Sequence, residues 1–461
     1  MISMIQKIFI IVGILTSFLV AQISHGPQEI STAGTFATQS RGDDVLGWNP
    51  ANLGFEDNPR WSLGFGLLPL VPIPSFELNN SSISPNWIND YLLGGIYLDS
   101  ETKDEMLDVF HNNRWDIYPS IQAKFLGFSY QNFAISTGLE MNTSISLSKS
   151  LFELVFTGLL FDEPMNLDEM NIGMQTVLPI SMAYGTEMDI PFLSDYTEET
   201  YVGVGTKILF GLVYFETEKF NASLESKKDR VLGEGEIIMR YNLGGTFFQK
   251  DSLLSYTSVV DERKNINGLG FAFDIGVSVK ILDEMTANIA FNNLFGSIRW
   301  GQATSYQHKL SYDLDLTSEE FEDIADYNES QEDSLLETII TTDTSYAIDG
   351  FTTNYPTYML VGFQYDLMDK LTVFTNYQQV FSSSFYTSTT PRLSIASEYR
   401  PWKWLPIRSG FSIGGLERFQ WGFGLGLQFT HYALDIGFSQ NGGMFNYAKG
   451  LSLSIEQKLL F

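Results

Sequence analysis

The sequence predicts an all-β fold, a transmembrane antiparallel β-barrel of about fourteen strands (twelve to sixteen) with an N-terminal plug segment and short helices. Long stretches alternate between apolar and polar or small residues, and successive side chains of a strand point to opposite faces. Beyond the N-terminal segment, no stretch is long and apolar enough to cross a membrane as a helix. Only helices and closed barrels satisfy every backbone hydrogen bond in lipid, so this pattern indicates a barrel.

Residues 1–21 have the layout of a signal peptide. Lys7 is the only charge before an apolar run that extends to Ala21. The run is shorter than the roughly 20 residues of a spanning helix, and the small Ala21 precedes Gln22 as at a cleavage site. We therefore expect a cleaved signal peptide and export through the inner membrane. A single membrane anchor is the alternative.

The composition excludes several classes of function. The chain has no cysteine, which excludes disulfides, thiolate chemistry and a lipid-modified cysteine at the cleavage site. The formal net charge of −28 makes nucleic acid a poor partner. Aromatic residues make up 14% of the chain, enough for the aromatic girdles that barrels place at both membrane surfaces.

Residues 22–60 lack sustained alternation and contain a compact Asn-Pro-Ala turn. The proline fixes its own backbone, the preceding asparagine is biased to an extended shape, and the alanine is small enough for close packing. Two acidic residues and a tryptophan come shortly before the turn. The candidate residues of this segment are Asp43, Asp44, Trp48, Asn49, Pro50 and Ala51. Considered alone, the segment is a rigid turn that leads into the first strand near residue 61.

An Asn-Pro-Ala turn that follows an acidic residue and precedes a long β-rich region resembles the hatch of the long-chain fatty-acid transporter superfamily of outer-membrane barrels. Residues 268–277 and 398–415 are similar to its PorV-like relatives. The resemblance implies that residues 22–60 fold as a plug inside a barrel of residues 61–461. It also implies that the six candidate residues hold the plug or line a substrate path. Residues 45–48 depart from the transporters, which have small polar residues there.

Three stretches give the clearest strand pattern. Apolar residues of one parity run through all thirteen residues of 269–281, against the usual five or six residues of a strand. Residues 419–430 alternate with glycine and small polar residues, which leave room for a plug against the wall. Residues 451–461 alternate and end on Phe461. Together with Leu459, this ending resembles the signal that the barrel-insertion machinery reads; an ordinary amphipathic strand is the alternative.

Other segments break the strand pattern. Residues 84–113 favour short helices with Ser100 as an N-cap, and residues 148–161 have the spacing of a short amphipathic helix. Residues 313–349 are rich in Asp and Glu and contain no Lys or Arg. We predict a long extracellular loop here, partly helical around 318–327. Clustered carboxylates can bind Ca²⁺, but the D-x-D-x-D-G spacing is absent, so we expect a solvated loop and no metal site.

The sequence carries no recognisable signature of an enzyme. Its four histidines are scattered, and the GxSxG, HExxH and phosphate-cradling glycine patterns are absent. A Ser–His pair at His431, as an outer-membrane phospholipase would need, is the one alternative. We therefore expect neither catalysis nor a cofactor.

The leading hypothesis is a monomeric barrel that passes small hydrophobic molecules across the bacterial outer membrane. The candidate lining is Trp48, Asn49 and Pro50 of the plug and the apolar residues of 69–76, for which an irregular loop at the barrel rim is the alternative. A protein-binding module associated with secretion is the alternative, and the acidic segment would favour a basic partner face. A cation-preferring porin is the third possibility. The expected partners are outer-membrane lipid, the insertion machinery, and a hydrophobic small molecule or a secreted protein.

Overall fold

The computed structural model describes most of the chain. The predicted signal peptide falls within residues 1–25, and most of the candidate stretch 69–76 falls within residues 67–73, so both predictions lie outside the described residues. The described residues are 26–66, 74–94, 97–168, 170–191, 196–243, 246–250, 256–260, 267–317, 319–320, 335 and 338–461, with two of these segments (246–250 and 256–260) described by their backbone alone.

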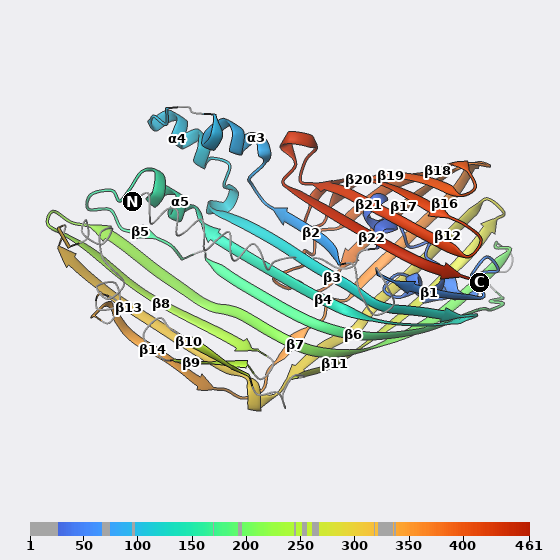
Figure 1. The fold of residues 1–461 in the computed structure, drawn as a ribbon, viewed down its shortest axis with the longest axis horizontal. Coiled ribbons are helices and arrows are strands. Elements are labelled where there is room, and N and C mark those ends of the chain that lie inside the picture. Colours follow the sequence, from blue (N-terminus) through green and yellow to red (C-terminus); the bar gives the residue numbers. More distant parts are fainter. Residues whose placement is uncertain are drawn as a thin grey trace.

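Fourteen antiparallel strands close into a barrel, which confirms the predicted fold class and strand number (Figure 1). β1 (Trp61–Phe65) and β2 (Ser75–Asn80) form one wall strand, because both pair with β3 and β22. The other wall strands are β3 (Arg114–Tyr130), β4 (Phe133–Ser148), β6 (Asn171–Glu187), β7 (Glu199–Ser226), β11 (Gly268–Leu282), β12 (Met285–Trp300), β16 (Tyr358–Met368), β17 (Leu371–Val380), β18 (Arg392–Trp402), β19 (Leu405–Gly414), β20 (Arg418–Gln428), β21 (Tyr432–Asn441) and β22 (Gly450–Leu460).

The end of the chain closes the barrel on its first strand. The backbone N–H of Phe461 donates to the carbonyl oxygen of Trp61 at 2.9 Å, and the N–H of Trp61 donates back to the carbonyl oxygen of Phe461 at 2.8 Å. The two rings stack with centroids 4.0 Å apart, and the ring of His431 lies 4.7 Å from that of Phe461. Leu459 pairs with Leu63 next to these contacts. Phe461, Leu459 and His431 therefore all lie at the closing seam.

The apolar parity of the wall faces outward. On β11, Leu269, Phe271, Phe273 and Ile275 are 45–51% exposed, whereas the residues between them are buried. A continuous apolar outer surface of this kind is stable against lipid and not against water. The inward parity carries the glycines and small polar residues, as the pattern of residues 419–430 predicts.

The two ends of the barrel differ in their connections. Two-residue turns at 131–132, 283–284, 369–370 and 403–404 join strands at one end, which we call the short-turn end. Most of the longer connections and the helices lie at the other, the loop end (Figure 1); the connection of β6 to β7, residues 188–198, is an exception. Outer-membrane barrels keep short turns on the periplasmic side and long loops outside.

Three short helices form where the sequence predicts helices: α3 (Pro85–Trp87), α4 (Ser100–Leu107) and α5 (Lys149–Phe156). Trp87, Met106 and Phe110 share a small apolar core, against which Phe152 packs. The N-cap of α4 is Asp99 and not Ser100, because the Asp99 carboxylate accepts the Thr102 N–H at 2.9 Å. No helix among the described residues is long and apolar enough to cross a membrane.

One wall strand continues beyond the barrel. β7 has 28 residues; its first half pairs with β11, and its second half pairs with β8 (Arg230–Asn242). β8 pairs with β13 (Tyr306–Thr317), and β13 pairs with β14 (Ile340–Ala347). We call β8, β13, β14 and the second half of β7 the sheet extension (Figure 1).

The sheet extension corrects the predicted acidic loop at 313–349. Residues 313–317 end β13, and residues 340–347 form β14, so both ends of the segment are strands. The prediction failed because β14 has no apolar alternation, and only the last five residues of β13, which does alternate, fall within the segment. The helix predicted around 318–327 lies mostly outside the described residues.

The N-terminal segment lies inside the barrel as the predicted plug. It contains α2 (Pro27–Ser31) and two short 3-10 helices, η1 (Gly42–Val45) and η2 (Pro50–Gly54). Inward-facing glycines make room for its backbone. A Cβ on Gly203 would lie 2.2 Å from the backbone nitrogen of Ala51, and one on Gly422 would lie 2.2 Å from the carbonyl oxygen of Ile30. Larger wall residues at these positions would therefore displace the plug.

We predict that Phe461→Ala weakens barrel closure. The substitution removes two ring contacts, and aromatic pairs contribute about 1 kcal/mol each, so the free energy of unfolding should fall by about 2 kcal/mol. The measurement is the temperature at which the purified barrel loses its compact migration on an unboiled gel. Phe429→Ala is the control, because it removes a single ring contact of 6.3 Å, which is to Trp404 and not to Trp61, His431 or Phe461. An equal loss in both variants would contradict a special role for the seam.

Candidate functional site

The Asn-Pro-Ala turn anchors the plug to the wall. The Asn49 Nδ2 donates to Ser278 Oγ on β11 at 2.9 Å, while its Oδ1 accepts the Ala51 N–H at 3.0 Å. Pro50 lies against Gly185 on β6, where an added Cβ would come within 2.2 Å of the Pro50 carbonyl oxygen. The residues of the turn thus pack against the wall and form hydrogen bonds with it.

Polar side chains on other wall strands bind the plug backbone. Each of four plug carbonyl oxygens accepts a hydrogen bond from β12, β16 or β17: Ala37 from Asn288 (2.6 Å), Trp48 from Asn292 (2.9 Å), Gly34 from Asn376 (2.9 Å) and Gly47 from the Tyr358 hydroxyl (2.6 Å). A buried carbonyl without a partner costs about 1–3 kcal/mol. The three asparagine amides and the tyrosine hydroxyl therefore supply hydrogen-bond partners for the irregular plug backbone and fix its position.

Lys124 on β3 joins the plug to the wall by charge. Its Nζ forms an ion pair with Asp43, lies 3.2 Å from Asp44 Oδ1, and lies 2.7 Å from Glu456 Oε1 on β22. Asp43 is only 1% exposed, and its carboxylate also accepts a hydrogen bond from Ser62 Oγ at 2.7 Å. Lys124 therefore links the plug to two wall strands.

Lys458 completes this group of charges. Its Nζ forms an ion pair with Asp44 and lies 3.6 Å from Glu456 Oε2. Burial raises the pKa of Asp43, but the charges of Lys124 and Lys458 lower it more, so the pKa of Asp43 lies well below its usual value. We call Asp43, Asp44, Lys124, Glu456 and Lys458 the charge cluster.

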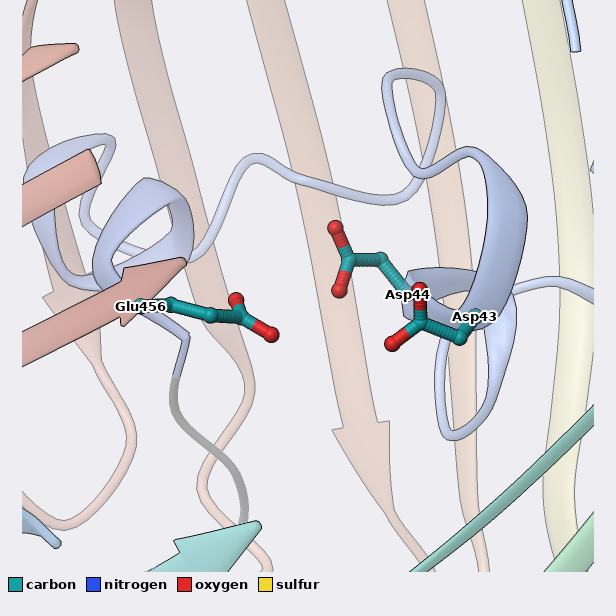
Figure 2. Close-up of side chains that lie close together, drawn as sticks. All are labelled: Asp43, Asp44 and Glu456. Carbon is teal, nitrogen blue, oxygen red and sulfur yellow. The ribbon is translucent and has the colours of Figure 1, made fainter. Parts of the chain in front are cut away.

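Figure 2 shows the three carboxylates of the charge cluster, two from the plug and one from β22. One oxygen of each lies within 4.8 Å of the others, a spacing that a divalent cation can bridge. However, Lys124 and Lys458 already place two ammonium groups among these oxygens. The charges nearly balance, so the electrostatic attraction for a metal ion is small.

A cavity of about 180 Å³ adjoins the charge cluster. The predicted residues Asp43, Asp44 and Trp48 line it, as does Ser181 on β6. Trp48 packs edge-on against Phe36, another lining residue, with ring centroids 5.7 Å apart. The lining therefore combines aromatic rings with charged and hydroxyl groups. Since an apolar cavity of about 150 Å³ binds benzene, this cavity has room for one ring-sized molecule.

The cavity lies where the first wall strand is interrupted. From the pair Phe65–Gln457 to the pair Phe76–Leu453, the chain advances eleven residues on the first strand but only four on β22. The pairing with β3 shows a similar mismatch on the other side. Residues of β3 and β22 line the cavity at this level. Among the described residues, the pairing of the first wall strand with β3 and β22 is therefore interrupted beside the cavity.

The structure divides the six predicted plug residues into two groups. Asp43, Asp44 and Trp48 line the cavity, whereas Asn49, Pro50 and Ala51 anchor the plug. The sequence analysis missed the wall partners of the first group, Lys124, Glu456 and Lys458. A signal existed for two of them, because Glu456 and Lys458 are charges on the inward parity of the last strand.

We predict that Gly127→Ala loosens the plug without changing any charge. The added Cβ would lie 2.1 Å from Asp43 Oδ2, so the carboxylate must leave its place beside Lys124. Protease should then cleave the plug of the folded barrel faster than in the parent protein. Gly301→Ala is the control, since its nearest contact is an ordinary 3.4 Å to the Asn267 carbonyl oxygen. Equal protection of both variants would show that Gly127 has no steric role.

We predict that Lys124→Met destabilises the plug more than the double substitution Lys124→Met/Asp43→Asn. The single variant leaves buried carboxylates without their main counter-charge, at a cost of about 3–5 kcal/mol. The double variant removes one of those charges and should recover part of the loss. Hydrogen exchange of plug amides, followed by mass spectrometry, measures the difference. The charge argument fails if the double variant exchanges as fast as the single one.

Solved structures of low sequence identity share the fold. The TodX deltaS2S3 mutant monoaromatic hydrocarbon channel matches with a TM-score of 0.50 and 10% identity, covering 95% of this chain and 98% of that chain. The Pseudomonas putida toluene transporter TodX matches with a TM-score of 0.49 and 10% identity, covering 95% and 99%. The CymD monoaromatic hydrocarbon channel matches with a TM-score of 0.46 and 12% identity, covering 96% and 99%.

At this identity the likeness shows the fold alone, a closed β-barrel like those of the outer-membrane proteins that the sequence resembles. No curated protein matches the sequence significantly. A family model described as "Family of unknown function (DUF5723)" matches residues 54–437. Because this match covers most of the chain, the protein belongs to the DUF5723 family.

Proposed function

We propose that the protein lies in the bacterial outer membrane and passes small hydrophobic molecules across it, as a monomer without a catalytic step or cofactor. The observation that carries this proposal is the cavity between plug and wall, at an interruption of the first wall strand. The outer-membrane location is supported by the outward apolar parity and by the FadL-like fold. Export by a cleaved signal peptide is part of the same proposal.

In this proposal the molecule enters from the loop end, rests in the cavity, and leaves sideways between β3 and β22. The mismatch of pairing at β1 and β2 supports the sideways exit, because backbone hydrogen bonds hold the wall together elsewhere along these strands. Removal of apolar surface from water is favourable by about 25 cal/mol of free energy per Å². A hydrophobic molecule that passes from the cavity directly into lipid therefore avoids the cost of exposing its apolar surface to water.

The lining favours a molecule with an apolar ring and a hydrogen-bond donor. Trp48 and Phe36 offer apolar contacts, while Asp44 and Glu456 offer carboxylate oxygens. TodX and CymD are described as monoaromatic hydrocarbon channels. A monoaromatic compound with a hydroxyl or amino group would match the size and the polarity of this cavity. A carboxylate group would find no free cation here, because both lysines of the lining, Lys124 and Lys207, already form ion pairs with carboxylates.

The sheet extension favours a second candidate function, the binding of a protein partner. Among the described strands, β14 pairs with β13 alone, so β14 forms the edge of the described sheet. An extended segment of a partner can add to such an edge by backbone hydrogen bonds. This candidate does not require the cavity, which separates the two experimentally. The plug and its contacts with the wall argue against a simple porin.

We predict that Ser181→Trp, which fills the cavity, weakens binding of 4-propylphenol to the purified barrel by about tenfold or more, or ~1.4 kcal/mol. Calorimetry in mild detergent measures the affinity. Met182→Trp is the matched control, because the adjacent side chain of a strand points to the opposite face. The parent protein should bind 4-propylphenol more tightly than propylbenzene or 4-propylbenzoate.

Two results would count against this proposal. If Ser181→Trp binds 4-propylphenol as tightly as the parent protein, the cavity is not the binding site. If the parent protein binds none of the three compounds, passage of small aromatic molecules is rejected, and the protein-binding candidate becomes the stronger one.

A further inference from the structure

A groove of about 770 Å³ lies on the outer face of the wall, across β7, β11 and β12. Its apolar lining comes from Phe210, Phe271, Phe273 and Phe295, and Arg299 adds the one charged group among its lining residues. The groove is separate from the cavity beside the plug, since the two have no lining residue in common.

Two β-bulges in β12 shape this groove. The pairs Phe271–Ser297 and Phe273–Leu294 are separated by two residues on β11 but by three on β12, and a second shift follows toward Ile275. Bulges re-aim side chains, and here Phe295 has a φ of +58° and is 85% exposed on the outer face. A phenyl ring with this degree of exposure is stable where lipid acyl chains cover it.

The groove lies at the loop end of the membrane-facing wall. Gly268 begins β11, Trp300 ends β12, and the two residues pair at the open end of this hairpin. Arg299 pairs with Leu269, the first of the outward apolar residues that continue down β11. Arg299 therefore lies at the edge of the apolar surface, at the height of lipid head groups, and the phenyl rings lie at the height of the acyl chains.

The charge of the groove differs from that of the chain. The formal net charge is −28, which repels anionic lipid in general. Arg299 is exposed and has no ion pair among the described residues. A guanidinium binds a phosphate through two parallel hydrogen bonds. The local chemistry thus combines a phosphate-binding cation with an apolar groove directly beneath it.

We propose that this groove binds one anionic, phosphate-bearing lipid of the surrounding leaflet, with a phosphate on Arg299 and an acyl chain against Phe295 and its neighbours. This site holds a resident lipid at a fixed height on the barrel and is independent of the molecule that the barrel passes. It would therefore stand even if the cavity bound no aromatic compound.

The test is native mass spectrometry of the delipidated barrel with dioleoyl phosphatidylglycerol or dioleoyl phosphatidylcholine, which share acyl chains and differ in net charge. The parent protein should retain one phosphatidylglycerol in preference to phosphatidylcholine. Arg299→Gln should lower retention of phosphatidylglycerol about fivefold, the effect of one basic residue near an anionic lipid surface. Lys403→Gln, which removes a cation at the short-turn end, should leave retention unchanged. Phe295→Ser should lower retention of both lipids.

Three outcomes would overturn the proposal: equal retention of the two lipids by the parent protein, equal losses in Arg299→Gln and Lys403→Gln, or displacement of the lipid by inorganic phosphate alone. The last would indicate a simple anion site, because phosphate does not compete for the apolar groove. Compact migration on an unboiled gel verifies that each variant is folded.

Discussion

A β-sheet in lipid cannot leave an open edge, and this constraint governs the rest of the structure. Each unpaired backbone N–H or C=O in the membrane costs several kcal/mol, so the last strand must pair with the first. Closure then gives every strand an outer face for lipid and an inner face for a lumen. The inner face can be polar, but its groups still need partners. The plug, the asparagines that bind its backbone and the buried ion pairs are the ways in which those groups are satisfied.

Charged residues of the lumen are arranged in pairs that cross between neighbouring strands and the plug. The Arg408 guanidinium lies 2.6 Å from Glu398 and also contacts Asp435, which accepts a hydrogen bond from Gln28 of the plug at 3.0 Å. The charge cluster around Lys124 likewise joins neighbouring wall strands to the plug. Buried ion pairs often contribute little net stability, since desolvation offsets their attraction. These ion pairs instead fix the position of the plug, because all of them form together in this one placement.

Much of the fold could be predicted because the alternation of apolar and polar residues along a strand indicates which face contacts lipid. The thirteen alternating residues of 269–281 and the terminal Phe461 led to a closed barrel, and the Asn-Pro-Ala turn led to the plug. The partners of Asp43 could not be predicted in this way. Lys124 and Glu456 are 332 residues apart, and they meet only through the pairing register across the seam. The strands within 313–349 were missed for a different reason: β14 has no apolar alternation, and only the last five residues of β13 fall within this segment.

The position of the plug at the start of the chain determines the order in which the protein can assemble. Trp61 and Phe461 lie 400 positions apart in the sequence, the longest separation among the described contacts between two wall strands. Contacts of such high sequence separation form late, because the chain entropy of closing the loop must be overcome first. The plug precedes Trp61 directly, and its Asp43 and Asp44 bind Lys124 on β3 and Lys458 on β22, on the two sides of the first strand. These ion pairs are complete only when both ends of the sheet have met, so seating of the plug is coupled to closure of the barrel.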